Sequence, residues 1–388
     1  MLDVAEARAR LLEQLIPPAL DAQLLPLAEA AGRLCAIEVP AISPSPPHRR
    51  AVMDGYALRA ADLPGPLPVA FEVPAGSALE RLPQGQCARI FTGAPVPEGA
   101  DRVIPQENLI SQQGGVTLQS SPQTWIRPAG DDIQLGQRLV SVGQKLGPAE
   151  LGLLASGGHA DVPVQQPLSV RLLTTGDEVR ELGVELESGQ IYNSNATSLS
   201  ALLQGWGVLV THQHVPDDPQ AMRDALKQAA ADQHLILTVG GVSVGDHDHV
   251  RPAIEALGSI DSFKVRMQPG KPFAFGQIDG VPVCCLPGNP ASAMVTAMLF
   301  VRPAIQTLSG QSADLTSFAL PVKFTVPATE RRRFLRVRWL KDGMTLHPNQ
   351  DSCSLSPLVW ATGLCEIPEH TAVNRGDVLN YYPFAELI

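Results

Sequence analysis

Apolar segments and helical patterns alternate through the middle third of the chain, and this alternation constrains the fold more than any other feature. The apolar segments cover residues 169–175, 207–214, 234–241 and 281–288, and each has the length of a strand. Helical patterns lie between and after them, at 194–206, 219–231, 249–257 and 289–308. Strands that are apolar along their whole length are buried on both faces, which is typical of parallel sheets covered by helices. The sequence therefore predicts a central, doubly wound parallel α/β module over residues 169–311.

Short strands separated by proline and glycine turns predict β structure on both sides of this module. The segment 40–48 (PAISPSPPH) predicts a stiff, extended connector because proline fixes φ. We expect two short helices in the first 35 residues. The predicted domains are a helical and linker domain (1–46 with 136–168), a small β domain (47–135), the α/β module and a C-terminal β domain (312–388). The expected fold class is multidomain α/β plus β, with an N-terminal α/β-rich region and a small C-terminal barrel or sandwich.

Composition excludes several classes of function. The net charge of −10 argues against a general binder of nucleic acid or anionic membranes. The longest apolar stretch, 293–305, is interrupted by Arg302 and Pro303 and is shorter than the ~20 residues that a membrane span needs. The N-terminus shows no secretory apolar region, and the cysteines are scattered without a CxxC pair. We therefore expect a cytoplasmic protein without nucleic-acid or membrane partners.

Three loops follow the predicted strands at the edge of the sheet where open α/β folds bind ligands. They are TTGDE (174–178), GGVSVGDHDH (240–249) and LPGNPAS (286–292), which leads into a helix. Glycine turns and a helix N-terminus suit phosphate because they present backbone N–H groups. The loops also carry carboxylates that could bind a bridging Mg²⁺ ion, namely Asp177, Glu178, Asp246 and Asp248. Together they predict a site for a phosphorylated ligand and a divalent metal.

Basic side chains near these loops are candidate partners for an anionic ligand. Lys271 lies in the segment MQPGKPFAFG, and Lys264 and Arg266 lie on the strand before it. By contrast, the arginines at 331–333, 336 and 338 alternate along a strand and are predicted to form a solvated face.

The histidines carry less information. His212 and His214 lie on a predicted strand, and we expect them to be packing or surface residues. His247 and His249 could bind zinc, but their spacing matches no known zinc pattern and no further His or Cys ligands support it.

Five segments resemble motifs of the molybdopterin molybdenumtransferase family, which includes MoeA and the E domain of gephyrin. They occur in family order and spacing, as MDGYAL (53–58), FTGAPVPEGAD (91–101), TTGDEV, GGVSVGDHDH, and PGKPFAFG followed by LPGNPAS. The resemblance covers nearly the whole chain. Molybdopterin adenylyltransferases and competence-damage type nucleotide hydrolases share only the middle module, so the flanking motifs favour the transferase.

This resemblance implies an enzyme that inserts molybdate into adenylylated molybdopterin and releases AMP with the assistance of Mg²⁺. Because the reacting groups are all negative, such a site needs a divalent cation and lysines. The resemblance also implies a homodimer, with a cleft between the β domain of one subunit and the α/β module of the other. Molybdopterin adenylyltransferase and molybdoenzymes are candidate partners. Two alternatives are an adenylyltransferase or nucleotide hydrolase on the same module, and a non-catalytic pterin-binding scaffold.

The resemblance assigns site residues as well. It implies catalytic roles for Asp54, Thr92, Glu178, Asp217 and Asp248. The substrate-binding residues predicted from the motifs and the loop chemistry are Asp132, Thr175, Gly176, Gly240, Gly241, Ser243, Gly245, Lys264, Lys271, Pro287, Gly288, Asn289 and Pro290. The family usually has a lysine at the position of Gln268 and an arginine at that of Ala196. This chain therefore has less positive charge around the expected anion site.

Overall fold

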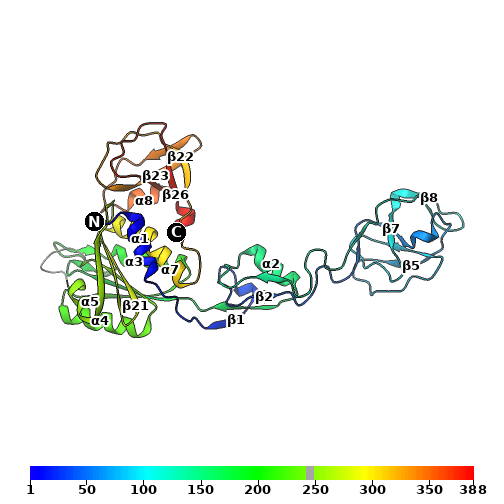
Figure 1. Ribbon diagram of the computed structural model, residues 1–388, viewed down its shortest axis with the longest axis horizontal. Helices are drawn as coiled ribbons and strands as arrows, with labels where there is room; N and C mark the ends of the chain where they lie inside the picture. The colour runs from blue at the N-terminus through cyan, green and yellow to red at the C-terminus, as the bar shows by residue number, and fades with distance from the viewer. Residues whose placement is uncertain (242–248) are drawn as a thin grey trace. The chain divides into compact units, whose positions relative to one another are not determined.

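The chain forms two compact units (Figure 1). The structure, a computed structural model, describes residues 1–241 and 249–388, with only the backbone for Ser262 and Phe263. Residues 1–21 and 166–388 make up the first unit, and residues 22–165 make up the second.

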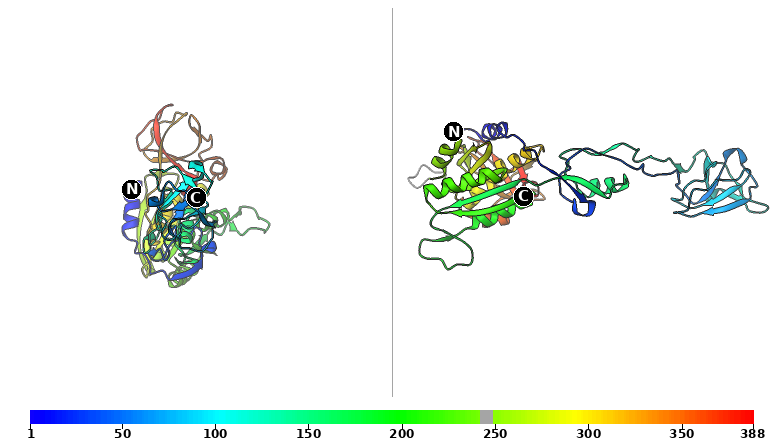
Figure 2. Two further views of the ribbon diagram at one scale, coloured as in Figure 1. Left: turned by 90° about the vertical axis from the view of Figure 1, so that its right-hand side faces the viewer. Right: turned by 90° about the horizontal axis from the view of Figure 1, so that it is seen from below.

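A six-stranded sheet forms the centre of the first unit (Figure 2). Its strands, in spatial order, are β16 (Leu209–Val215), β13 (Ser169–Thr175), β17 (Leu235–Val239), β21 (Val281–Leu286), β20 (Pro272–Ile278) and β18 (Gly258–Lys264). The first four are parallel, as predicted, whereas β20 runs antiparallel to both of its neighbours. The turn between β20 and β21 consists of Asp279 and Gly280 at φ of 49° and 82°, as a tight two-residue hairpin requires. The prediction from apolar segments did not include this antiparallel strand, although Asp279-Gly280 is a sequence signal for a hairpin.

Helices cover both faces of this sheet. Successive residues of a strand point to opposite faces, and both sets contribute buried side chains. Leu172 and Leu237 pack into one core, whereas their neighbours Leu173 and Ile236 pack into the other. The first core takes side chains from α1 (Val4–Glu13), α3 (Ser194–Gly205), α6 (Pro290–Thr296) and α7 (Arg302–Leu308). The second takes them from α4 (Pro219–Asp232) and α5 (Val250–Leu257). This is the doubly wound arrangement that the sequence predicts.

The helical segment Pro290–Leu308 is the candidate membrane span found in the described residues, by length and composition alone. It consists of α6, a π-helical turn at Ala297–Val301 and α7. The helix continues through Pro303, which follows the π-helical turn, so the proline that interrupts the apolar stretch 293–305 does not end the helix. The fold buries 78% of its most apolar window, which is the environment of a core helix.

The helix α1 belongs to the α/β unit, so the prediction that groups it with residues 136–168 is wrong. Val4, Ala7 and Leu11 are buried in the first core of the sheet. Leu2 extends this attachment through a parallel bridge to Val265. The spacing of apolar residues indicates a helix, but it does not indicate which core that helix covers.

The C-terminal domain is a small β barrel. Its strands follow the order β19 (Met267–Gln268), β23 (Arg332–Leu340), β25 (Gly363–Ile367), β26 (Val378–Pro383) and β22 (Phe318–Pro321), and β24 (Gly343–Leu346) also pairs with β23. A bridge between Val322 and Met344 closes the sheet on itself. The short helices α8 (Ser356–Trp360) and α9 (Phe384–Leu387) complete the domain.

The arginine-rich strand β23 does not form the predicted solvated face. Phe334 packs into the α/β core and Leu335 into the barrel core, so both faces of the strand are covered. Arg333 and Arg336 are buried as a result, and burial lowers the pKa of Arg336 to about 10. The alternation correctly indicates a strand, but it does not reveal that a second domain covers the polar side.

One β region of the second unit combines residues from both ends of that unit. Strand β1 (Ala22–Pro26) pairs with β12 (Asp161–Gln165), β2 (Val39–Pro40) pairs with β11 (Arg138–Val140), and α2 (Pro148–Ser156) shares their core. The second helix expected in the first 35 residues is absent, and β1 with a 3-10 turn at Leu27–Glu29 takes its place. Pro17, Pro18 and Pro26 disfavour a helix there because proline cannot donate a backbone hydrogen bond.

The other β region contains the motif MDGYA. Its sheet has the order β5 (Val69–Val73), β6 (Cys87–Ile90), β4 (Gly55–Leu58) and β7 (Arg102–Pro105). Two further strand pairs are β3 (Arg50–Ala51) with β10 (Ile126–Arg127) and β8 (Leu109–Ser111) with β9 (Thr117–Leu118), and 3-10 turns lie at Ala60–Asp62 and Gln106–Asn108. A side chain at Gly55 would overlap the carbonyl oxygen of Ile104 on the neighbouring strand. The close approach of the neighbouring strand therefore explains why the motif has glycine at position 55.

Candidate functional site

A cavity of about 460 Å³, here named the edge cavity, lies at the carboxyl ends of β13, β17 and β21. Parallel strands end at one edge of a sheet, so loops that are far apart in the sequence meet there. Of the predicted site residues, the edge cavity brings together Thr175, Gly176, Glu178, Asp217, Gly240, Gly241, Gly288, Asn289 and Pro290. The start of α3, the segments that contain Val179 and Ile191, and Cys353 of the C-terminal domain also line it.

Asp217 holds the TTGDE loop in place. One oxygen of its carboxylate accepts a hydrogen bond from the Thr175 hydroxyl at 2.7 Å, and the other accepts from the backbone N–H of Asp177 at 3.2 Å. In return, the backbone N–H of Asp217 donates to the Asp177 carboxylate at 3.2 Å. Asp217 therefore positions the first loop from the neighbouring strand β16, besides lining the cavity.

Glu178 is the exposed carboxylate of the edge cavity. Its carboxylate forms no hydrogen bond or ion pair with any residue that the structure describes. Gly176 makes room for this carboxylate, because a Cβ atom at position 176 would lie 2.8 Å from a Glu178 oxygen. The backbone of Gly176 also has φ of 129°, a conformation that favours glycine. Glu178 is thus free to bind a cation or a substrate proton.

Two further glycine turns meet across the cavity. Gly240 follows β17 and has φ of 92°. The two turns are close, because a Cβ atom at Gly288 would lie 3.7 Å from the Cα atom of Gly240. Bare backbone therefore lines this part of the cavity, which suits close approach of phosphate.

A polar network behind the cavity centres on Thr174, which is 2% exposed. Its hydroxyl lies 2.9 Å from His212 Nε2 and 3.2 Å from His214 Nδ1, and it accepts from the Asn193 amide at 2.9 Å. Burial lowers the pKa of His212, so its imidazole is neutral at pH 7. The prediction of packing or surface roles did not foresee that these histidines hold a cavity residue.

The start of α3 contributes amides to the site. The Asn193 side chain caps the helix by accepting from the backbone N–H of Ala196 at 3.0 Å. The Asn195 amide donates to the carbonyl of Gly288 at 2.7 Å and joins α3 to the LPGNPAS loop. Ala196, at the position of a family arginine, is buried and lies outside the cavity lining.

Two of the four predicted metal ligands, Asp177 and Glu178, belong to the described residues. Glu178 lines the edge cavity, whereas Asp177, next to it in the sequence, does not and accepts a hydrogen bond from the backbone N–H of Asp217 instead. Asp246 and Asp248 lie outside the described residues, as do Ser243, Gly245 and His247. Within residues 1–241 and 249–388, no three His, Cys, Asp or Glu side chains gather closely enough to hold a metal.

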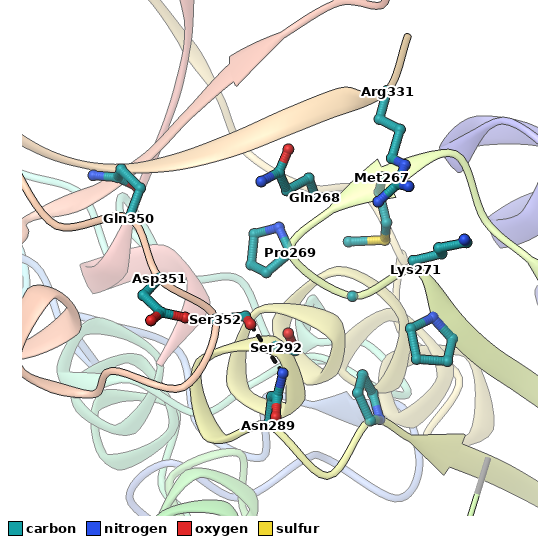
Figure 3. A pocket seen from close by; sticks show the side chains of 13 residues that line it. Met267, Gln268, Pro269, Lys271, Asn289, Ser292, Arg331, Gln350, Asp351 and Ser352 are labelled. Atoms are coloured by element: carbon teal, nitrogen blue, oxygen red, sulfur yellow. Dashed lines mark hydrogen bonds between the residues drawn. The ribbon is translucent and has the colours of Figure 1, made fainter. Parts of the chain in front are cut away.

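A second cavity of about 320 Å³, here named the barrel cavity, lies between the PGKP loop and the C-terminal barrel (Figure 3). Lys271 and Arg331 line it, and neither forms an ion pair with a described residue. Gln268 lines it as well, and so does the predicted Pro287. Arg331 was predicted to be solvated, so the sequence reasoning missed this cation.

Lys264 does not reach either cavity. Lys264, Arg266 and Gln268 are exposed and alternate with buried Val265 and Met267, as the strand pattern predicts. Of these three polar residues, only Gln268 lines one of the two cavities.

Asn289 lines both cavities and thereby joins them. Its amide donates to the hydroxyl of Ser352 at 2.9 Å, as Figure 3 shows, and the Ser352 carbonyl accepts from the backbone N–H of Ala291. The segment 350–353 of the C-terminal domain therefore contributes to both cavities. No motif in that segment indicated such a role.

The second unit carries its own pair of predicted residues. The Asp54 carboxylate accepts from both the hydroxyl and the backbone N–H of Thr92, each at 2.7 Å. These bonds, with the nearby charge of Arg89, lower the pKa of Asp54 below its usual range. Asp132 lies in an exposed loop, where its backbone N–H donates to the Ser45 carbonyl.

Comparison with known proteins shows the family. The MoeA N-terminal region (domain I and II) matches residues 2–158, a probable molybdopterin binding domain matches 171–307, and the MoeA C-terminal region (domain IV) matches 305–384. A molybdopterin molybdenumtransferase of Haemophilus influenzae is 40% identical over 320 residues, which cover 80% of this chain and 78% of that protein. The chain belongs to the molybdopterin molybdenumtransferase family.

Further relatives extend this match to nearly the full length. Molybdopterin molybdenumtransferase 2 of Mycobacterium tuberculosis is 35% identical and covers 89% of this chain, which in turn covers 90% of that protein. A solved structure of a molybdopterin biosynthesis MoeA protein from Pyrococcus horikoshii is 28% identical, with a TM-score of 0.85 and 99% of each chain covered. The resemblance and the fold class predicted from the sequence are confirmed, including the regions that flank the middle module.

Proposed function

We propose that this protein inserts molybdate into adenylylated molybdopterin and releases AMP during molybdenum cofactor biosynthesis. The observation that carries the proposal is the pair of adjoining cavities. One has glycine turns and a free carboxylate, the other has unpaired cations, and both share Asn289. Membership of the molybdopterin molybdenumtransferase family supports the same reaction.

The edge cavity suits the phosphate part of the substrate. The backbone at Gly176, Gly240 and Gly288 allows phosphate oxygens to approach closely. Glu178 would hold Mg²⁺ from the cavity lining, with Asp177 beside it in the sequence as the second predicted carboxylate. In proteins this ion takes one or two carboxylates together with substrate phosphates. The hard oxygen donors of both residues fit this ion, and Asp246 and Asp248 stay candidate ligands. Bound Mg²⁺ would offset the negative charge of the phosphates and polarise the bond that releases AMP.

The barrel cavity suits the molybdate dianion. Lys271 and Arg331 supply two positive charges to the lining of this cavity. Asp351 supplies one negative charge, and the other described lining residues are uncharged. Arginine and lysine side chains form short, charge-assisted hydrogen bonds with oxyanions. Asn289 would keep the two anionic groups in neighbouring positions without adding charge.

We also propose a cytoplasmic homodimer in which Asp54 and Thr92 of one subunit serve the α/β module of the other. The hydrogen bonds that Thr92 donates keep the Asp54 carboxylate ionised, as a residue that faces a cation requires. Mixing inactive Asp54→Asn with inactive Glu178→Gln subunits should restore part of the activity. No recovery after subunit exchange would contradict a site shared between subunits.

The decisive experiment is to incubate the protein with adenylylated molybdopterin and Mg²⁺, with and without molybdate, while AMP is measured. We expect AMP to appear only when molybdate is present. AMP release that is independent of molybdate would point instead to a nucleotide hydrolase. No release in either case would contradict the proposed reaction.

A further inference from the structure

One wall of the edge cavity is apolar, in contrast to its glycine and carboxylate loops. The short parallel strands β14 (Val179–Arg180) and β15 (Ile191–Tyr192) carry this wall, and Val179, Ile191 and Tyr192 line the cavity. Ile191 is 55% exposed and Tyr192 is 45% exposed. Exposed apolar side chains that gather beside a polar cavity indicate a surface for a ligand.

Tyr192 is fixed in place on this wall. Its strand pairs with β14, and the backbone N–H of the next residue, Asn193, donates to the Arg180 carbonyl at 2.8 Å. The Tyr192 hydroxyl donates to the carbonyl of Val184 at 3.0 Å. Because its hydroxyl is already bonded within the protein, the ring is what Tyr192 offers to a ligand.

We propose that the ring of Tyr192 stacks on a planar nitrogen heterocycle of the substrate. This inference rests on the proposed function, because the proposed substrate, adenylylated molybdopterin, contains two such rings, adenine and pterin. Adenine is the expected partner because the glycine turns that suit its phosphate line the same cavity. An aromatic side chain that is already held in place loses little freedom on binding, and stacking tolerates changes in the substituents of the base.

The experiment measures binding of AMP, ribose 5-phosphate and neopterin to the full-length protein with Mg²⁺ by calorimetry. We expect Tyr192→Leu to weaken AMP binding about tenfold and to leave ribose 5-phosphate unchanged, because only AMP has a base to stack. Tyr192→Phe keeps a ring and should bind AMP within about twofold of the wild type. Leu182→Ala is the matched control, since Leu182 is 60% exposed on the loop between β14 and β15 and lies outside the cavity lining.

Each outcome decides the proposal. If Tyr192→Leu weakens neopterin but not AMP, Tyr192 stacks on the pterin half of the substrate. If the variant binds both ligands as the wild type does, the stacking role is overturned while the proposed function stands. If the wild type binds neither AMP nor neopterin, the proposed function itself fails, and the stacking role fails with it.

Discussion

The edge cavity and the barrel cavity are neighbours, but they are lined by opposite charges. Glu178 and Asp217 line the edge cavity, and no lysine or arginine is among its described lining residues. Lys271 and Arg331 line the barrel cavity. A single pocket with all four side chains would neutralise itself through internal ion pairs. Keeping them apart leaves the carboxylate of Glu178 free for a metal and the cations free for an oxyanion.

The largest effect is expected for Glu178→Gln, which removes the free carboxylate of the edge cavity. We expect AMP release to fall at least about 100-fold, because the charge that would hold the metal is lost. The melting temperature should not change, since the carboxylate has no partner among the described residues. Glu185→Gln is the control, because Glu185 is an exposed glutamate on the loop after β14 and lies outside the cavity lining. Normal turnover by Glu178→Gln would refute the metal assignment.

The next effect is expected for Arg331→Ala in the barrel cavity. Loss of a charge-assisted hydrogen bond should weaken molybdate binding roughly 10- to 100-fold in calorimetry. AMP binding should stay as in the wild type, because Arg331 does not line the edge cavity. If both ligands lost affinity equally, the two cavities would not be separate sites.

A smaller effect is expected for labelling of Cys353 by iodoacetamide. This cysteine is exposed and lines the edge cavity, whereas the other five cysteines are buried. AMP at ten times its dissociation constant should slow the labelling about tenfold by occupying the cavity. Molybdate alone should not protect the thiol. Protection by molybdate but not by AMP would reverse the assignment of the two cavities.

The smallest effect is expected for Gln268→Lys, which restores the family lysine in the barrel cavity. Gln268 is exposed, so the added charge should raise molybdate affinity only about threefold at low salt. The gain should shrink as ionic strength rises. Equal affinities of variant and wild type at low salt would show that position 268 does not contact the anion.

Much of the edge cavity could be predicted from the sequence because it depends on local patterns. TTGDE and LPGNPAS each follow an apolar strand, and parallel strands bring such loops to one edge. The glycine turns could also be predicted from the sequence. Gly176 and Gly240 have positive φ, a backbone conformation that other residues rarely adopt.

The barrel cavity was harder to predict because it depends on how two domains pack. Arg331 was predicted to lie on a solvated strand, yet it directly precedes β23 and lines a cavity. Ser352 and Cys353 reach the site only because the barrel packs on the α/β module. The attachment of α1 likewise follows from tertiary contacts, which sequence periodicity does not encode. The reversed strand β20 is different, because the Asp279-Gly280 turn is a local hairpin signal that the apolar pattern alone leaves out.

The two-residue strand β19 has a consequence for how this enzyme family can change. Met267 and Gln268 pair with β23 of the barrel, while the strands on either side of them in the sequence, β18 and β20, belong to the central sheet. The segment that carries Lys271 is therefore anchored to both the central sheet and the barrel. Replacing the barrel would remove Arg331 and residues 350–352 from the barrel cavity even if every residue of the α/β module were retained. Under the proposed function, preference among tetrahedral oxyanions depends on this domain junction, and a library that varies Arg331 and residues 350–352 would be the direct way to alter it.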